Sequence, residues 1–470
     1  MPCDAGGPWK GLTPRRVLRR GDGIRGRSRG SVLVIVLWVA FGLVSLGLYF
    51  SNSMTSEFRA SDNRVAGLEA EQAIEGAARY ATYLLSTLER PGQLPEVTTY
   101  QNEDAVVGDA RFWFVGRDYQ LTAPTRPYFA LVDESSKLNL NTATLEMLEA
   151  LPRMTPELAA AILDWRDADS DATANGAESD TYLRRNPAYN AKNGKFESVE
   201  ELRLLQGADM ELLVGEDTNM NGVLDANEND GMTSAPYDNK DGKLDAGILE
   251  YVTVYSRESN LRTNGSPRIN IRQGGQQELQ QVAGVLREKL AADRANQIIR
   301  QLGPTQGGFR STLEFFIRSR MTAEEFGLVG GDITVTNGAF IEGLVNVNTA
   351  SSEVLACIPG IGTDKAPSLI SYRLSNPDKL TSAAWVVEVL GQASAIQAGP
   401  YITGQSSVFS ADIAAVGHHG RGFRRSRFIF DLSEGTPRVA YRQDLGHLGW
   451  ALGREVRERM TLLAEGGQTR

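Results

Sequence analysis

The sequence predicts an α+β protein with a long N-terminal helix, an antiparallel sheet, and a large, mostly helical insert between the two halves of that sheet. Three observations support this fold class. A run without charged residues extends from Gly30 to Ser56 and passes directly into a helical pattern. Runs rich in aromatic and β-branched residues stand before residue 137 and after residue 400. The segment between them contains three similar helical units. The predicted parts are 1–30, 31–90, 91–136, 137–395 and 396–470.

Charge is distributed unevenly along the 470 residues. The total is −9, but residues 1–30 carry eight Lys or Arg against two Asp, a surplus of six positive charges that leaves −15 for the rest. A body this acidic repels phosphate backbones and attracts cations. We therefore expect no nucleic-acid partner and consider a cation a reasonable ligand.

The apolar run is long enough to cross a membrane. Residues 31–50 form a helix of ~30 Å at ~1.5 Å per residue, which matches the hydrocarbon layer. Seven arginines precede the run, and positive residues stay on the cytoplasmic side. The sequence predicts one span, a cytoplasmic N-terminus and a body outside. A cleaved secretory signal is the weaker interpretation, because "LGLYFSNSM" has bulky aromatic residues where small ones are needed.

The helical pattern continues beyond the span. Apolar residues from Met54 to Leu88 recur mostly at steps of three, four or seven, which is typical of one stripe of an amphipathic helix. Pro91-Gly92 is the first strong stop signal. We therefore expect one helix over residues 31–90.

Strand-like runs frame the middle of the chain. Two begin at Ala110 and Arg126, and three more begin at Tyr401, Arg425 and Arg438, with glycine-containing turns between the last three. The insert is expected between the second and third of these strands. No nucleophile elbow, zinc helix, phosphate loop or dinucleotide fingerprint occurs, so the sequence predicts that the protein is not an enzyme.

Three middle segments open alike, with Asn between two aliphatic residues: "LNL", "INI" and "VNV", starting at Leu138, Ile269 and Val345. Thr142 and Thr349 are plausible N-caps for the helices that follow. The sequence "IPGIG" in the third copy resembles the hairpin of a helix-hairpin-helix, a motif whose glycine amides can approach DNA phosphates. Because no basic cluster flanks it, a turn between packed helices is the favoured interpretation.

The segment "DTNMNGVLDANE" fits a twelve-residue calcium loop position by position. Its side-chain ligands would be three early oxygens, a ninth-position acid and a bidentate twelfth-position acid, with one backbone carbonyl at the seventh position and glycine at the turn. The sequence predicts one structural Ca²⁺ here. The candidate ligands are Asp217, Asn219, Asn221, Val223, Asp225 and Glu228.

Two further acidic segments lie nearby. "DNKDGKLDAGILE" is an incomplete calcium loop, yet its acids could ligate a second Ca²⁺ in another arrangement. The acids of "DADSDATANGAE", from Asp167 to Glu178, are better interpreted as a solvated loop. The candidate ligands of the second site are Asp238, Asp241, Asp245 and Glu250.

The basic leader, the Gly30–Ser31 junction and the long apolar helix resemble the type IV pilins and the pseudopilins of type II secretion. The resemblance implies that a prepilin peptidase cuts after Gly30 and methylates the amine of Ser31. Most members have glutamate at the fifth mature position, where it pairs with the amine of a neighbouring subunit. Here that residue is Ile35. The sequence is similar to the K-type minor pseudopilins (the GspK family), which lack this glutamate and carry an insert like "LDWRDADSDATANGAESDTY".

This resemblance implies a pilin-like sheet and a place at the tip of the pseudopilus in the bacterial inner membrane, with the body in the periplasm. The expected work is to start assembly and control filament length during protein export. The implied partners are the minor pseudopilins of the I, J and H types, the inner-membrane secretion platform and the prepilin peptidase. The rival hypothesis is a membrane-anchored periplasmic DNA-binding protein with helix-hairpin-helix copies.

Overall fold

The computed structural model describes residues 30–90, 92–118, 125–303 and 308–467. It divides into two compact units, Met1–Asp62 and Asn63–Arg470. One helix, α1 (Gly30–Ser86), belongs to both units, so the long helix predicted from the sequence is confirmed, four residues shorter at its end. The predicted leader lies outside the described residues.

The first unit is described by the N-terminal part of α1 alone. Its side chains from Val32 to Phe50 are exposed and mostly apolar. Among the described residues, α1 is the one helix whose length and composition suffice to cross a membrane. Because water would not cover such a surface stably, lipid or other apolar helices are its natural environment.

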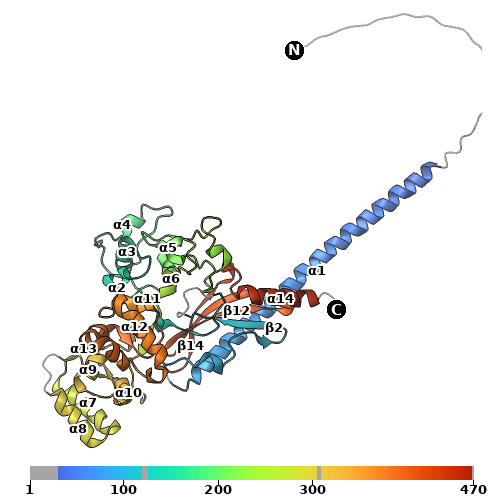
Figure 1. The fold of residues 1–470 in the computed structure, drawn as a ribbon. Coiled ribbons are helices and arrows are strands. Elements are labelled where there is room, and N and C mark those ends of the chain that lie inside the picture. Colours follow the sequence, from blue (N-terminus) through green and yellow to red (C-terminus); the bar gives the residue numbers. More distant parts are fainter. Residues whose placement is uncertain (1–29, 91, 119–124, 304–307, 468–470) are drawn as a thin grey trace, which may run out of the picture. The chain divides into compact units, whose positions relative to one another are not determined.

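The second unit is built on an antiparallel sheet with strand order β1-β2-β12-β13-β14, and β3 pairs with β12 beyond β2 (Figure 1). Every residue of β12 is buried, because both faces of the sheet are covered. The bounds are β1 Ala105–Val107, β2 Ala110–Val115, β3 Val132–Asp133, β12 Val408–Val416, β13 Arg424–Asp431 and β14 Arg438–Asp444.

The C-terminal part of α1 packs on one face of the sheet. Its buried residues are mostly alanines at helical spacing, from Ala66 to Ala81, and they meet Phe112, Phe114 and other aromatic side chains of the strands. Small side chains let the helix approach a surface that large rings already fill. Alternate residues Trp113 and Val115 point to the opposite face.

That opposite face is covered by α14 (Gly453–Gly467), a helix that was not predicted from the sequence. Met460 on α14, with Ala451 and Leu452 before it, packs against Trp113. A short amphipathic helix leaves a weaker sequence signal than a long one, because few of its residues need to be apolar.

The insert contains three units that each open and close with one parallel strand pair: β4 with β5, β7 with β8, and β10 with β11. In the opening strands, the Oδ1 atoms of Asn139, Asn270 and Asn346 accept hydrogen bonds from the amide two residues later, at 2.8–3.1 Å. The closing strands end at Thr253, Thr334 and Thr403, whose hydroxyls accept from the amide two residues later, at 3.2–3.3 Å. The predicted repetition is therefore confirmed, and each copy has a closing strand that the sequence analysis missed.

The helices of the insert lie between the opening and closing strands of each copy. The strand β6 follows the first copy, β9 precedes the third, and the two form an antiparallel pair. The first copy has β4 Leu138–Asn139, α2 Leu145–Glu149, α3 Pro156–Arg166, α4 Ser179–Tyr182, α5 Met210–Val214, α6 Ile248–Tyr251 and β5 Val252–Thr253. The second has β7 Ile269–Asn270, α7 Gln276–Lys289, α8 Ala292–Leu302, α9 Thr312–Ser319, α10 Ala323–Val329 and β8 Ile333–Thr334. The third has β10 Val345–Asn346, α11 Ser352–Ala356, α12 Gly362–Ser375, α13 Val386–Ala398 and β11 Ile402–Thr403; β6 is Arg257–Ser259 and β9 is Phe340–Glu342.

One pair of local predictions is wrong. The N-caps of α2 and α11 are Thr144 and Ser351, two residues after the predicted Thr142 and Thr349, which lie instead in the turns after the opening strands. The insert lies between β3 and β12, the strands found in the runs predicted from Arg126 and Tyr401. The strand β1 was not predicted, because three residues are too few to show a clear period.

The β12–β13 hairpin packs closely against α1 at two glycines. A Cβ atom on Gly417 would lie 2.1 Å from the carbonyl oxygen of Ala66, and one on Gly422 would lie 2.3 Å from the amide nitrogen of Gly67. His418 Nδ1 lies 2.7 Å from Glu69 Oε2. The hairpin turn is therefore packed against α1.

We predict that Gly422→Ala lowers the melting temperature more than Gly435→Ala does. Both glycines have positive φ, +68° and +96°, so both substitutions cost about 1 kcal/mol in backbone conformation. Only at Gly422 does the new methyl group also overlap α1, since nothing lies within 4 Å of a Cβ at Gly435. Thermal unfolding of the two variants measures the difference, and equal shifts would contradict the packed hairpin.

Candidate metal centres and assembly helix

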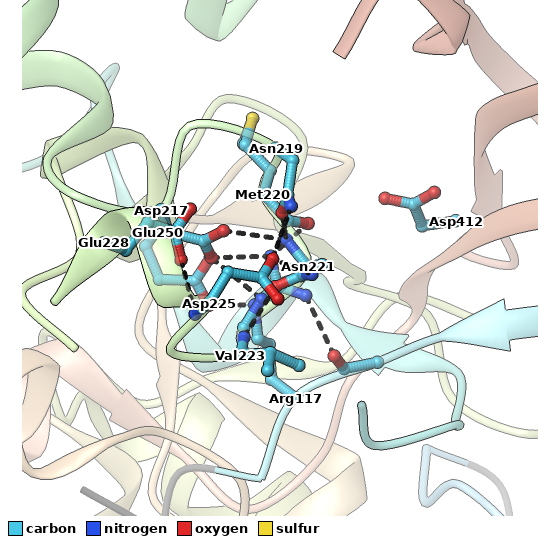
Figure 2. A network of polar contacts seen from close by, with 12 residues as sticks. Arg117, Asp217, Asn219, Met220, Asn221, Val223, Asp225, Glu228, Glu250 and Asp412 are labelled. Carbon is cyan, nitrogen blue, oxygen red and sulfur yellow. Dashed lines mark hydrogen bonds and ion pairs between the residues drawn. The ribbon is translucent and has the colours of Figure 1, made fainter. Parts of the chain in front are cut away.

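The loop 217–228 adopts a tight turn with its polar groups turned inward (Figure 2). Met220 and Gly222 have positive φ, +51° and +70°. The carboxylate of Asp217 accepts hydrogen bonds from the amides of Asn221 at 2.9 Å and Gly222 at 2.8 Å. Asn221 Oδ1 accepts from the amide of Val223 at 2.6 Å. The predicted first, third, fifth and sixth positions thus lie together at one turn.

The two late acids of this loop are held close to the turn. Asp225 Oδ2 accepts from the amide groups of Asn219 at 2.9 Å and Asn221 at 3.1 Å. Glu228 Oε2 accepts from the amide of Asp225, but Glu228 Oε1 is buried and has no hydrogen-bond partner among the described residues. Burial raises the pKa of Glu228 to about 8, and the negative charges of Asp217 and Asp225 act in the same direction. A divalent cation would remove this unfavourable burial of like charges.

The second acidic segment repeats the same turn. Lys240 and Gly242 have positive φ, as Met220 and Gly222 do. Its acids have protein partners: Asp238 accepts from the amide of Gly231 at 2.8 Å, and Asp245 forms an ion pair with Arg153. Asp241 accepts from the amide of Lys243.

Two glutamates beside these loops lie where the sequence could not place them. Glu250, a predicted ligand of the second site, faces the first loop and pairs with Arg117 at 2.9 Å. Glu216 faces the second loop instead, where its Oε2 accepts from the amide of Asp245 at 3.0 Å. Burial raises the pKa of Glu216, and the charge of Asp245 adds to that effect. Glu250, at the end of the second acidic segment, therefore lies at the first loop, and Glu216, which precedes the first loop, lies at the second segment.

The third acidic segment differs from its prediction. Asp169 and Asp171 are exposed, as expected for a solvated loop, but Asp164 and Glu178 are buried. Oxygens of Asp164, Asp167 and Glu178 lie within 4.8 Å of one another, and both carboxylate oxygens of Glu178 are buried without a hydrogen-bond partner among the described residues. Burial raises the pKa of Glu178, and the charges of Asp164 and Asp167 raise it further. Three converging carboxylates of this kind can hold a divalent cation.

The hairpin "IPGIG" lies against another helix. A Cβ atom on Gly360 would lie 2.6 Å from the carbonyl oxygen of Ser394 on α13, and Lys365 donates to the Ser394 hydroxyl. The matching turn in the first copy contains Arg153, whose side chain is paired with Asp245. The glycine contact is therefore used for helix packing, which does not favour the DNA-binding alternative.

A buried arginine joins the sheet to the first acidic loop. Arg425 on β13 is 0% exposed and forms two hydrogen bonds, each 2.8 Å, with the carboxylate of Asp412 on β12. Its Nη1 donates to the carbonyl oxygen of Asn219, and Nη2, which also bonds to Asp412, donates to the carbonyl oxygen of Met220. Burial raises the pKa of Asp412, but the charges and hydrogen bonds of Arg425, with Arg427, outweigh burial and hold that pKa at about 2.

The assembly helix begins at Gly30 in the structure. The side chain of Ile35 is 62% exposed on the apolar part of α1. Residues before Gly30 and the side chain of Ser31 lie outside the described set, so the processing site remains a prediction from the sequence.

Comparison with known proteins shows what part of the chain resembles. Residues 130–214, from just before β3 to the end of α5, match the family model described as "Type II secretion system (T2SS), protein K". The chain thus contains a protein K segment. It is 28% identical to the type II secretion system protein K of Klebsiella pneumoniae over 195 residues, 40% of this chain and 60% of that protein. The protein K of Pectobacterium carotovorum is 26% identical over 208 residues, 40% of this chain and 61% of that protein. This chain therefore spans about three fifths of the length of these two relatives.

A further relative and one solved structure carry the same family name. The protein K of Pseudomonas aeruginosa is 45% identical over 65 residues, which are 14% of this chain and 19% of that protein. The crystal structure of the GspK-GspI-GspJ complex from enterotoxigenic Escherichia coli aligns with 12% identity and a TM-score of 0.33, over 80% of this chain and 97% of that one. The protein K match includes Asp164, Asp167 and Glu178, and it ends three residues before the loop 217–228.

We predict that Asp412→Asn destabilises the protein strongly at pH 7, by about 3–5 kcal/mol, because Arg425 keeps its buried charge without a counter-ion. The pKa of Asp412 lies below its usual value, so its stabilising effect is complete above pH 4 and disappears as the pH falls toward 2. The shift corresponds to about 2 kcal/mol.

Urea unfolding of the full-length protein in detergent, at several pH values, measures both effects. Asp104→Asn is the matched control, because Asp104 pairs with Arg111 at the partly exposed surface and such pairs contribute less than about 1 kcal/mol. Equal losses in the two variants at pH 7 would contradict the importance of the buried pair.

Proposed function

We propose that this protein is a minor pseudopilin at the tip of the type II secretion pseudopilus. It would initiate assembly and control filament length during protein export across the outer membrane. The observation that carries the proposal is the combination, in one chain, of a protein K segment with an exposed apolar helix that has Ile35 at the fifth position after Gly30. The role is one of binding, without a catalytic centre.

The N-terminal helix supports a place at one end of a filament. A glutamate in hydrocarbon is costly unless it pairs with the amine of a neighbouring subunit. Ile35 needs no such partner and is compatible with lipid or with apolar helices. The insert supports the same place, because residues 138–403 add a second body to the sheet that a continuous stack of subunits would have to accommodate.

The partners follow from this place. The solved complex with the same family name contains GspI and GspJ. We propose the I, J and H types of minor pseudopilin as neighbours, with the secretion platform of the inner membrane and the prepilin peptidase acting earlier. One apolar N-terminal helix in a protein K relative is consistent with a single-pass membrane anchor, and we propose the inner membrane, with the body in the periplasm.

We also propose Ca²⁺ as a structural cofactor. The loop 217–228 supports one site through its turn geometry and the partnerless Glu228 Oε1. The cluster of Asp164, Asp167 and Glu178 supports another. Hard oxygen ligands of this kind suit Ca²⁺, and loops of the extracellular class bind it at ~0.1–1 mM.

We predict that the chain isolated in assembled pseudopili begins at Ser31 with a methylated amine and that an epitope tag on it labels one filament end. The N-terminus is expected because the prepilin peptidase cuts after Gly30 and methylates the new amine. Labelling at one end is expected because no further subunit is placed above this one. Mass spectrometry of the N-terminus and gold labelling measure the two results. Intact residues before Ser31, or labels along the shaft, would contradict the proposal.

We predict that calcium titration of Asp217→Ala combined with Glu228→Ala shows one site fewer than the unmodified protein. Asp164→Asn combined with Glu178→Gln should likewise remove one site, and the four-residue variant should remove two. Isothermal titration of full-length protein in detergent gives the stoichiometry. Asp169→Asn, on the exposed part of the third segment, is the matched control that keeps every site. Unchanged stoichiometry in either double variant would reject the corresponding site.

A further inference from the structure

We infer that the loop 217–228 is a calcium-dependent clamp between the helical insert and the sheet. A cation held by the loop would keep the carbonyl groups of Asn219 and Met220 in place to accept hydrogen bonds from Arg425 and Arg117. The inference rests on the calcium loop proposed above, and it adds a partner surface within the same chain and a consequence of binding.

The two sides of the loop have different tasks. Side chains at positions 217, 219, 221, 225 and 228 turn toward one another, as Figure 2 shows for the labelled residues. The backbone carbonyl oxygens of ligand residue Asn219 and of its neighbour Met220 instead accept hydrogen bonds from Arg425. Arg117, which follows β2, also donates to the carbonyl oxygen of Met220, at 2.9 Å.

The sheet side of this contact is rigid. Arg425 is fully buried, and Asp412 holds its guanidinium group in a bidentate pair that spans β12 and β13. Five donors in a fixed plane allow one arginine to serve Asp412 and two carbonyls at once, which lysine cannot do. The position of the two loop carbonyls is therefore defined from the sheet outward.

The loop side depends on charge. Asp217, Asp225 and Glu228 bring three acids together, and Glu228 Oε1 is buried without a hydrogen-bond partner among the described residues. Arg117 Nη2 lies 4.0 Å from Asp217 Oδ2, which is too far for a hydrogen bond. A cation among these acids would hold the turn from the inside while the arginines hold it from the outside.

Hydrogen exchange of the full-length protein in detergent tests the clamp. At free Ca²⁺ about ten times the dissociation constant, the open population falls about tenfold. We expect amides of 217–228, and also of 111–118 and 412–427, to exchange about tenfold more slowly than in EGTA. In Asp217→Asn with Glu228→Gln, Ca²⁺ should slow exchange neither in the loop nor in the sheet segments. Any slowing that remains in this variant comes from Ca²⁺ at the cluster of Asp164, Asp167 and Glu178, and it is the baseline for the comparison.

Two conservative variants separate the clamp from the metal site. Arg425→Lys keeps a charge beside Asp412 but cannot reach both loop carbonyls. Ca²⁺ should therefore still slow exchange in the loop, and in 111–118 through Arg117, while segment 412–427 loses its tenfold effect. Arg427→Lys is the matched control, because Arg427 also pairs with Asp412, at 3.2 Å, and should behave as the unmodified protein does.

The outcomes distinguish this inference from the proposal beneath it. If titration shows Ca²⁺ in the loop but exchange in 111–118 and 412–427 is the same with and without it, the clamp is wrong and the calcium loop stands. If the loop binds no Ca²⁺, both are wrong. If Arg425→Lys keeps the tenfold effect on 412–427, Arg425 does not transmit it.

Discussion

The buried pair of Arg425 and Asp412 is the interaction on which the arrangement of the second unit depends. A guanidinium group with no exposed surface requires that every nitrogen find an acceptor, and here the acceptors come from two places. Asp412 lies on the neighbouring strand, while the carbonyls of Asn219 and Met220 belong to the insert, about two hundred residues earlier in the chain. The charge therefore has no satisfactory environment unless the insert lies against the sheet.

The insert between β3 and β12 also helps to cover the sheet. β12 is buried at every position, so it needs cover on both faces. α1 supplies one cover through alanines that face Phe112 and Phe114, and α14 supplies part of the other with the help of Trp113. The acidic loop completes the second cover at its polar end. The strand β12 therefore has apolar contacts and one charged contact. Hydrophobic burial stabilises the apolar contacts, and pairing of Asp412 with Arg425 stabilises the charged one.

Sequence reasoning found the features that repeat or that persist over many residues. The long helix was predictable because its period extends over more than fifty residues, and β12–β14 because each is seven to nine residues long. The closing strands of the three insert units escaped notice because two residues, such as Val252–Thr253, cannot show a period. The calcium-loop prediction concerned local spacing, but the burial of Glu178 and the exchange of Glu216 with Glu250 between loops are tertiary facts. They depend on which segments the first insert unit brings together, and no single-segment pattern encodes that.

On the proposed function, the calcium affinity expected of an extracellular-type loop would give the proposed clamp a direction. Loops of the extracellular kind bind Ca²⁺ at ~0.1–1 mM, whereas cytoplasmic sensors respond at ~0.1–10 µM. A loop of the first kind stays empty at cytoplasmic calcium levels and fills outside the inner membrane. The segment from Gly215 to Asp245 buries little apolar surface and is rich in acids, so its own packing contributes little to order. On the proposed function, the insert would therefore become fixed to the sheet only after the body has crossed the membrane, in the compartment where the tip is assembled.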